Sequence, residues 1–203
     1  MNKYPRTLHL PFSPEIHSDD KTINIDTLNE LLSHQIVITE KMDGGNCMMQ
    51  KGVGVFARSH SLPTSCPTFN LIKNIHFFPK EYLMNDNYLY FGENLYAVHS
   101  IKYENLEDTF FLFKIYDKEK KLWLSYTDVV EEAQRLNFKM PNIIKSGFFT
   151  FKELQIFLDS DIKTRNNFEG YVINNMDSFG KDEFSNNVVK YVPKIINSAF
   201  FIL

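Results

Sequence analysis

The sequence predicts one α+β domain, with mixed, mostly antiparallel sheets flanked by helices. Three observations support this fold class. Phe and Tyr are abundant, at 19 and 10 of 203 residues, and aromatic side chains are enriched in strands. Short apolar, β-like runs recur along the whole chain, whereas helical patterns are few and brief. No stretch has the composition of an interdomain linker, so the elements should share one domain.

The chain should open with an extended lead-in, because residues 1–20 contain three prolines. Asp26 should then cap a short helix that has leucines on one face. The β-branched run at residues 36–38 predicts a buried strand. The glycine pair Gly44-Gly45 predicts a tight turn, so residues 46–50 should form the hairpin partner of that strand.

The rest of the chain alternates strand-like runs with helices. Two helices should begin at Thr127 and Thr150, and the second opens a capping box with Glu153. The polar stretch at residues 159–167 should be a loop. Further strands are expected over residues 53–58, 88–96, 109–117, 122–124, 169–173 and 188–192, and a partly helical segment over residues 69–78.

The composition excludes several classes of protein. A formal net charge of −3 gives no overall basic field, so a nucleic-acid partner would need a local basic groove. The two cysteines, Cys47 and Cys66, provide neither a disulfide framework nor a zinc spacing, and we expect both to be inert. No segment is long and apolar enough to cross a membrane, and the first residues lack a signal-peptide pattern. We therefore expect a cytoplasmic, reducing location and no membrane contact.

A lysine follows the buried run, in the stretch Thr39-Glu40-Lys41-Met42-Asp43-Gly44-Gly45-Asn46. Glycines beside a strand end leave bare backbone, which lets a phosphate approach closely. A lysine in such a place can act as a covalent nucleophile. From these residues alone, a hairpin with solvent-facing charges is the simpler interpretation.

Three later stretches, also at strand ends, complete an ordered series with this one. The four are Lys41-x-Asp43-Gly44, Phe91-Gly92-Glu93, Glu169-Gly170-Tyr171-Val172 and Val188-Val189-Lys190. In this order they resemble motifs I, III, IV and V of the covalent nucleotidyltransferases, which comprise ATP-dependent polynucleotide ligases and capping enzymes. Phe113 resembles motif IIIa, and Arg58-Ser59 resembles motif Ia.

The finer features resemble the RNA ligase family. They are Glu40 directly before the lysine, the run from Gly92 to Ile101, and residues 168–173, within a resemblance that spans residues 36–194. The resemblance implies the nucleotidyltransferase fold, ATP-grasp-like and shared with DNA ligases. It also implies that residues 1–203 are a single adenylyltransferase domain with no C-terminal OB or other accessory domain.

The resemblance implies an ATP-dependent RNA ligase that uses Mg²⁺ or Mn²⁺. Lys41 would attack the α-phosphorus of ATP and form a covalent lysyl-AMP. The AMP would pass to an RNA 5′-phosphate, and a 3′-hydroxyl would then displace it to seal the strand. The expected partners are RNA ends, a nicked duplex, and a protein that supplies further RNA binding.

The family roles carry over residue by residue. Glu93 and Glu169 would serve the ribose and the metal, Glu40 would accept from the adenine amino group, and Phe113 would stack on the base. Asp43 would orient the lysine loop. The full nucleotide-binding set is Glu40, Asp43, Gly44, Arg58, Glu93, Phe113, Glu169, Lys190 and Lys194.

Each assignment has a plainer alternative. Phe113 could be core alone, and Glu93, Glu169 and Lys190 could be ordinary strand residues facing solvent. Motif V of these ligases often has a second basic residue close after the first, but here only Lys194 could serve, two residues out of the usual alternation. Val98 stands where many relatives have lysine, and His99 fits a structural role as well as a catalytic one.

Two other functions stay open. A capping-type guanylyltransferase would use the same lysine with GTP, although Glu40 and the residues after Gly92 argue against it. An inactive nucleic-acid-binding module of the same fold is the second, although such a module would not need Lys41, Glu93, Glu169 and Lys190 together.

Overall fold

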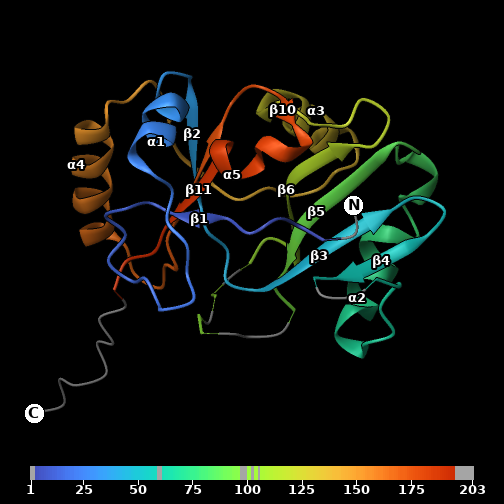
Figure 1. The fold of residues 1–203 in the computed structure, drawn as a ribbon. Helices are drawn as coiled ribbons and strands as arrows, with labels where there is room; N and C mark the ends of the chain where they lie inside the picture. The colour runs from blue at the N-terminus through green and yellow to red at the C-terminus, as the bar shows by residue number, and fades with distance from the viewer. Residues whose placement is uncertain (1–2, 59–60, 97–99, 102, 105, 195–203) are drawn as a thin grey trace, which may run out of the picture.

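Two β-sheets, with helices α1 to α4 on their outer faces, make up the fold (Figure 1). The computed structural model describes residues 3–58, 61–96, 100–101, 103–104 and 106–194. Within these residues the predicted α+β class with mostly antiparallel sheets is confirmed, because a single strand pair, β1 with β11, is parallel. No helix in these ranges is both long and apolar enough to span a membrane.

The first sheet carries the strand that ends at Lys41. Its interior strand β2 is buried along nearly its whole length, as the β-branched run predicts. The sheet has the order β1-β11-β9-β2-β8 in the described part of the chain. Its strands are β1 (Leu8–His9), β2 (Ile36–Glu40), β8 (Ile143–Gly147), β9 (Tyr171–Asn175) and β11 (Val188–Tyr191).

The second sheet is antiparallel throughout and has the order β10-β7-β6-β5-β3-β4. Its long central strands β5 and β6 are almost wholly buried, in keeping with their run of aromatic residues. The strands are β3 (Gly45–Gln50), β4 (Gly54–Ala57), β5 (Tyr88–Asn94), β6 (Phe110–Asp117), β7 (Leu122–Trp123) and β10 (Phe179–Gly180).

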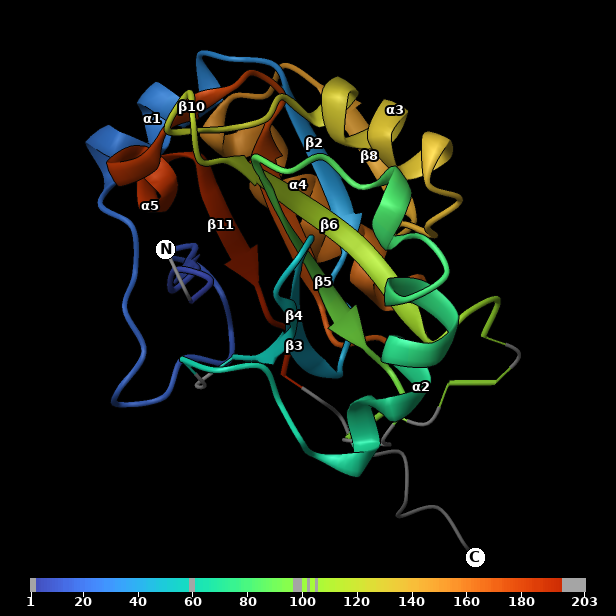
Figure 2. The ribbon, with the colours of Figure 1, turned by 90° about the vertical axis from the view of Figure 1, so that its right-hand side faces the viewer.

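Helices cover the outer face of each sheet. Helices α1 (Ile25–Leu32) and α4 (Phe151–Asp161) bury leucines against the first sheet. On the second sheet lie α3 (Tyr126–Arg135) and α2 (Asn70–Ile72), and Figure 2 shows both on the same side of β5 and β6. The remaining short turns of helix are η1 (Pro67–Phe69), the π-helical turn η2 (Lys73–Phe77), η3 (Glu81–Leu83), η4 (Ile162–Thr164), η5 (Lys181–Glu183) and α5 (Phe184–Asn187).

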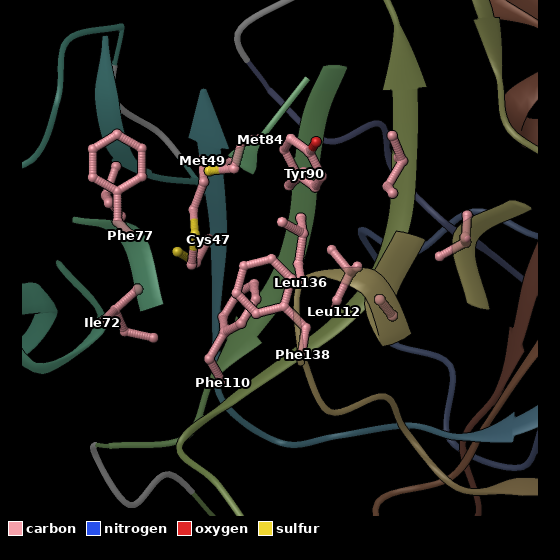
Figure 3. Packing of buried hydrophobic residues seen from close by; sticks show 14 of the residues in the cluster. Cys47, Met49, Ile72, Phe77, Met84, Tyr90, Phe110, Leu112, Leu136 and Phe138 are labelled. Atoms are coloured by element: carbon pink, nitrogen blue, oxygen red, sulfur yellow. The ribbon is translucent and has the colours of Figure 1, made fainter. Parts of the chain in front are cut away.

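An apolar cluster of aromatic and aliphatic side chains lies between the second sheet and its helices (Figure 3). Cys47 is fully buried in this cluster, and burial raises the pKa of its thiol, which keeps it protonated. A separate cluster joins the inner faces of the two sheets and contains Phe91, Trp123 and Val188. The sheets are therefore packed against each other as well as against their helices.

The predicted hairpin between residues 36–38 and 46–50 is wrong. Strand β2 pairs with β8 and β9 in the first sheet, whereas β3 pairs with β4 and β5 in the second. Gly44 is needed for close packing, because a Cβ there would lie 2.5 Å from the carbonyl oxygen of Asn94. The chain thus crosses from one sheet to the other immediately after Lys41.

Several helix boundaries also differ from the predictions. The cap of α1 is Asn24, whose side chain accepts from the N–H of Thr27, and α3 begins after Ser125. The capping box at Thr150 is confirmed. The expected loop at residues 159–167 is largely helical, because α4 runs to Asp161 and η4 follows it.

Three strands were not expected from the sequence. Strand β1 turns part of the lead-in into a sheet edge, and β8 and β10 extend the two sheets. Each is short or lacks a run of β-branched residues, so local sequence gives little indication of it. The strands that were expected are present, with ends shifted by a few residues.

Candidate active site

A cavity of about 390 Å³ lies between the two sheets. Its volume falls in the range of small-molecule sites, roughly 300–1,000 Å³. Strands β2, β9 and β11 of the first sheet contribute to its wall, as do β3, β5 and β6 of the second. Of the predicted site residues, eight line it: Glu40, Lys41, Gly44, Arg58, Glu93, Phe113, Glu169 and Lys190.

Lys41 is fixed by a backbone bond to the segment that carries Glu169. Its N–H donates to the carbonyl oxygen of Gly170 at 2.8 Å, and its ammonium group donates to Glu169 Oε1. Gly170 has φ of +152° and approaches Tyr191 so closely that a Cβ would lie 2.3 Å from its carbonyl oxygen. Only glycine fits there, so the glycine of the motif sets the distance between Lys41 and Glu169.

Glu169 is a largely buried carboxylate, and one of its two oxygens accepts no hydrogen bond from the described residues. Burial raises the pKa of Glu169, and the neighbouring charge of Lys41 opposes that rise. Its Oε2 is buried and has no hydrogen-bond partner among the described residues. A buried carboxylate oxygen without a partner is costly unless a cation or a donor fills the place.

Glu93 projects into the same cavity from β5, opposite Asn46 of β3. Burial raises the pKa of Glu93 to about 8, and the charge of Glu169 adds to the rise, whereas Lys41 opposes it. One carboxylate on β5 and one just before β9 thus lie near the same lysine.

Phe113 reaches the cavity because of a bulge. Phe91 pairs with Lys114 and Gly92 pairs with Leu112, so Phe113 is an extra residue on β6. Gly92 has no room for a side chain, since a Cβ would lie 2.3 Å from the ring of Phe110. The half-buried ring of Phe113 lines the cavity and packs edge-on against Tyr4, with centroids 5.1 Å apart.

Two cations stand beside the lysine, Lys190 from β11 and Arg58 from the end of β4. Burial and the charge of Lys41 lower the pKa of Lys190, whereas the charges of Asp20 and Glu169 raise it. Lys190 Nζ lies 3.8 Å from Asp20 Oδ1. The cavity therefore combines cations suited to phosphate with four acidic side chains, Asp20, Glu40, Glu93 and Glu169.

Glu40 is held in place by one neighbour. Its N–H donates to the carbonyl oxygen of Asn142 at 2.9 Å, and the Asn142 side chain donates to Glu40 Oε2 at 3.1 Å. This pairing fixes the carboxylate on the cavity wall, where Met140 and Pro141 lie beside it.

Two predicted site residues lie away from the cavity wall. Asp43 Oδ2 accepts from the N–H groups of Ser100 and Ile101, each at 2.7 Å, so this carboxylate anchors a neighbouring loop. Lys194 is exposed and does not line the cavity. Ser59, Val98 and His99, which belong to the motif stretches, lie outside the described residues.

The N-terminal arm, residues 4–23, is a wall of the cavity that sequence reasoning missed. Tyr4, Arg6 and Asp20 line the cavity, and β1 pairs with β11 so that His9 lies opposite Lys190. The alternating pattern around His9 could have indicated a short strand, but nothing in the sequence indicated that this strand pairs with β11.

The two carboxylates of Glu93 and Glu169 suit a divalent metal whose other ligands are phosphate and water, rather than one bound by protein side chains alone. No cluster of three or more His, Cys, Asp or Glu side chains suited to a metal occurs within the described ranges. Magnesium is commonly bound by one or two carboxylates, with phosphate and water completing its shell. Glu93 and the partner-less oxygen of Glu169 match that donor set.

A known protein family matches most of the chain. The family described as RNA ligase matches residues 34–192, which include every predicted site residue except Lys194. A comparison with curated protein sequences finds no match.

Solved structures resemble this one in fold. An RNA ligase variant from Naegleria gruberi in its apo form is 16% identical, with 95% of this chain and 57% of that chain covered and a TM-score of 0.66. An archaeal ATP-dependent RNA ligase is 13% identical, with 94% and 48% covered and a TM-score of 0.65. A putative ATP-dependent DNA ligase from Aquifex aeolicus is 17% identical, with 94% and 50% covered and a TM-score of 0.63.

These likenesses show that the chain shares the fold of the covered part of these ligases. The chain spans about half to three fifths of the length of the ligases that it matches.

Proposed function

The chain belongs to the RNA ligase family, and from this premise we propose that it is an ATP-dependent RNA ligase acting through a covalent nucleotide on Lys41. One observation carries the proposal. The cavity brings Lys41 together with two carboxylates, two cations and an aromatic ring, from separate stretches of the chain. A binding module would need the cations and the ring, but not a lysine held against a buried carboxylate.

The first step is attack by Lys41 Nζ on the α-phosphorus of ATP. The Lys41 ammonium group first gives one proton to water; the free amine then forms the P–N bond as the P–O bond to pyrophosphate breaks, and a second proton passes from the nitrogen to water. Phosphoryl transfer depends mainly on in-line positioning and charge neutralisation. Lys190 and Arg58 supply positive charge on the side of the cavity where the phosphates would lie.

The base is held on the other side. Phe113 offers a ring face to a purine, and Glu40, fixed by Asn142, accepts from an exocyclic amine. Adenine has an amino group on C6 that can donate to Glu40, whereas guanine has a carbonyl oxygen on C6 that cannot. This arrangement therefore favours ATP.

Glu93 and Glu169 would hold Mg²⁺ or Mn²⁺. When bound, the metal would neutralise charge on the phosphates. A Naegleria gruberi ligase variant was solved with ATP and Mn, and it is 17% identical to this chain, which it covers to 95%, with a TM-score of 0.63. The pairing of Lys41 with Glu169 must open for the amine to attack, and a cation at Glu169 would compete with the lysine for that carboxylate.

The nucleotide then passes to an RNA 5′-phosphate, and a 3′-hydroxyl closes the strand. We propose RNA ends or a nicked duplex as the substrate, with further RNA contacts from a protein partner. The chain's net charge of −3 supports this division, because intrinsic phosphate binding depends on basic side chains.

Labelled nucleotides test the proposal. The protein is incubated with Mg²⁺ or Mn²⁺ and with ATP or GTP labelled at the α-phosphate. Label should be retained from ATP by the wild type and lost in Lys41→Ala. Lys51→Ala is the matched control, because Lys51 also follows a strand end and pairs with a carboxylate, Asp86, at 3.3 Å, but lies off the cavity wall.

Sealing of a 5′-phosphorylated nick in an RNA duplex then tests the later steps. Label from GTP alone would favour the capping-type enzyme. No label from either nucleotide would favour an inactive binding module.

A further inference from the structure

Three side chains of the N-terminal arm form a line that ends at Lys190, and no motif contains them. Asp20 stands between the other two groups. Its Oδ1 lies 3.8 Å from Lys190 Nζ, and its Oδ2 lies 3.2 Å from His9 Nε2. The opposite ring nitrogen, His9 Nδ1, lies 3.2 Å from Ser13 Oγ. Asp20 lines the cavity, whereas His9 and Ser13 are buried behind it.

The arm also fixes the backbone on both sides of Lys190. The N–H of Leu10 donates to the carbonyl oxygen of Lys190 at 2.8 Å. The N–H of Val192 donates to Ser13 Oγ at 2.9 Å. The arm therefore contacts both the backbone of Lys190, through Leu10, and its side chain, through Asp20. His9 links the two contacts, because it precedes Leu10 in β1 and lies beside Asp20.

We propose that Asp20 is a positioning residue, held by His9, that keeps the Lys190 ammonium aimed at the nucleotide phosphate. This inference rests on the proposed function, because it needs a phosphate in the cavity. It adds to that function a role for the arm, whose residues lie outside the family match.

Charge explains why a carboxylate is useful beside a phosphate site. Lys190 is half-buried, and Lys41 and Arg58 repel its charge, so its ammonium form needs compensation. The groups that face it are Asp20 and His9 from the arm, Lys41 after β2, Arg58 after β4, and Glu169 before β9. Of the two acids, Glu169 is already paired with Lys41. Asp20 Oδ2 faces His9, so Asp20 Oδ1 is the carboxylate oxygen left to support Lys190.

Asp20→Asn tests this role, with Asp19→Asn as the matched control. Asp19 is the adjacent acid, is exposed, and pairs with Arg6 at 3.6 Å. The rate of lysyl-AMP formation should fall about tenfold in Asp20→Asn and stay unchanged in Asp19→Asn. Without Asp20, Lys190 should lose its proton at lower pH, so the alkaline limb of the pH–rate profile should move down by about one unit.

His9 gives a second, independent pair of variants. His9→Gln keeps an N–H that can reach Asp20, whereas His9→Leu removes it. His9→Gln should retain most of the rate, and His9→Leu should resemble Asp20→Asn, including the shifted alkaline limb. Thermal unfolding midpoints identify any variant that fails to fold. If one of the Asp20 or His9 variants does not fold, the variants of the other residue test the proposal.

The outcomes separate the two proposals. No adduct in the wild type overturns the proposed function and this inference together. An active wild type whose Asp20→Asn and His9→Leu variants keep its rate and pH profile overturns this inference alone. A reduced rate with an unmoved alkaline limb also overturns it, because a purely structural role predicts that result.

Discussion

Lys41 lies where the chain leaves one sheet and enters the other, and this position gives it neighbours from both. Its backbone is bound to Gly170 beside β9, and its side chain meets Glu169. Glu93 reaches it from β5 of the second sheet. A lysine on an ordinary hairpin would be surrounded by one sheet only, so the crossover places Lys41 at the cavity.

Glu93 should make stability depend on pH. Its folded pKa of about 8 lies above the reference value of 4.5, so its contribution to stability is complete below pH 4.5 and is lost as the pH rises through 8. Glu93→Gln should remove this loss, which we expect to amount to about 3–4 kcal/mol between pH 5 and 8.5. Denaturant unfolding at both pH values measures it.

Glu30→Gln on the exposed face of α1 is the control for Glu93→Gln, since it replaces a carboxylate in water. The comparison between variant and wild type cancels the titration of other groups. Equal pH dependence in wild type and Glu93→Gln would contradict the burial of this carboxylate.

The motif residues could be proposed from the sequence because their ordered series resembles a known family, whereas the residues around Lys41 alone favoured an ordinary hairpin. Lys41, Glu93 and Glu169 are examples, and the structure brings all three to one cavity. Asp20 and Tyr4 could not be predicted, because their place depends on pairing between β1 and β11, far apart in the sequence.

At the scale of elements, the connection from β2 to β3 shows how local sequence can mislead. Two glycines after a β-branched run are typical of a hairpin turn. Here Gly44 instead lets the connection pack against the end of β5, where Asn94 and Leu95 fill the space of a side chain. Which sheet β3 joins is decided by its pairing with β5, and that contact is not encoded in the turn itself.

Gly44→Ala should destabilise the protein by about 1–3 kcal/mol, because the new methyl group must displace backbone. Its Cβ would lie 2.5 Å from the carbonyl oxygen of Asn94 and 2.7 Å from Leu95 Cδ2. Gly45→Ala is the control, since its nearest contact would be 3.9 Å. The free energy of unfolding measures the difference, and equal values for the two variants would contradict this packing.

The start of helix α4 could be predicted from local sequence, but its end could not. Its capping box was predictable because both partners lie within one turn. Its length was not, because its last residues are held by tertiary bonds from Tyr171 to Asp161 and from Tyr191 to Asp159. A polar stretch that looks like a loop in the sequence therefore continues the helix.

At the scale of the whole molecule, the two sheets share one inner cluster. Trp123 is fully buried there, with its ring 5.4 Å from that of Phe91 and 4.9 Å from that of Phe184. Phe184 and the adjoining Val188 belong to α5 and β11, next to the first sheet. The cavity lies between the same two sheets, so its geometry depends on their staying together.

The two sheets should therefore unfold in one transition. Trp123 is the single tryptophan of the chain, so its fluorescence reports on the contact between the sheets. Its denaturation curve should coincide with that of far-UV circular dichroism. Loss of the fluorescence change at lower denaturant than the loss of secondary structure would contradict a shared core.

Mass spectrometry of the intact protein after incubation with ATP and a divalent metal tests the central claim most directly. The mass should rise by one AMP, and fragmentation should place the added group on the peptide that contains Lys41. An unchanged mass, or an added group on a different residue, would contradict the account.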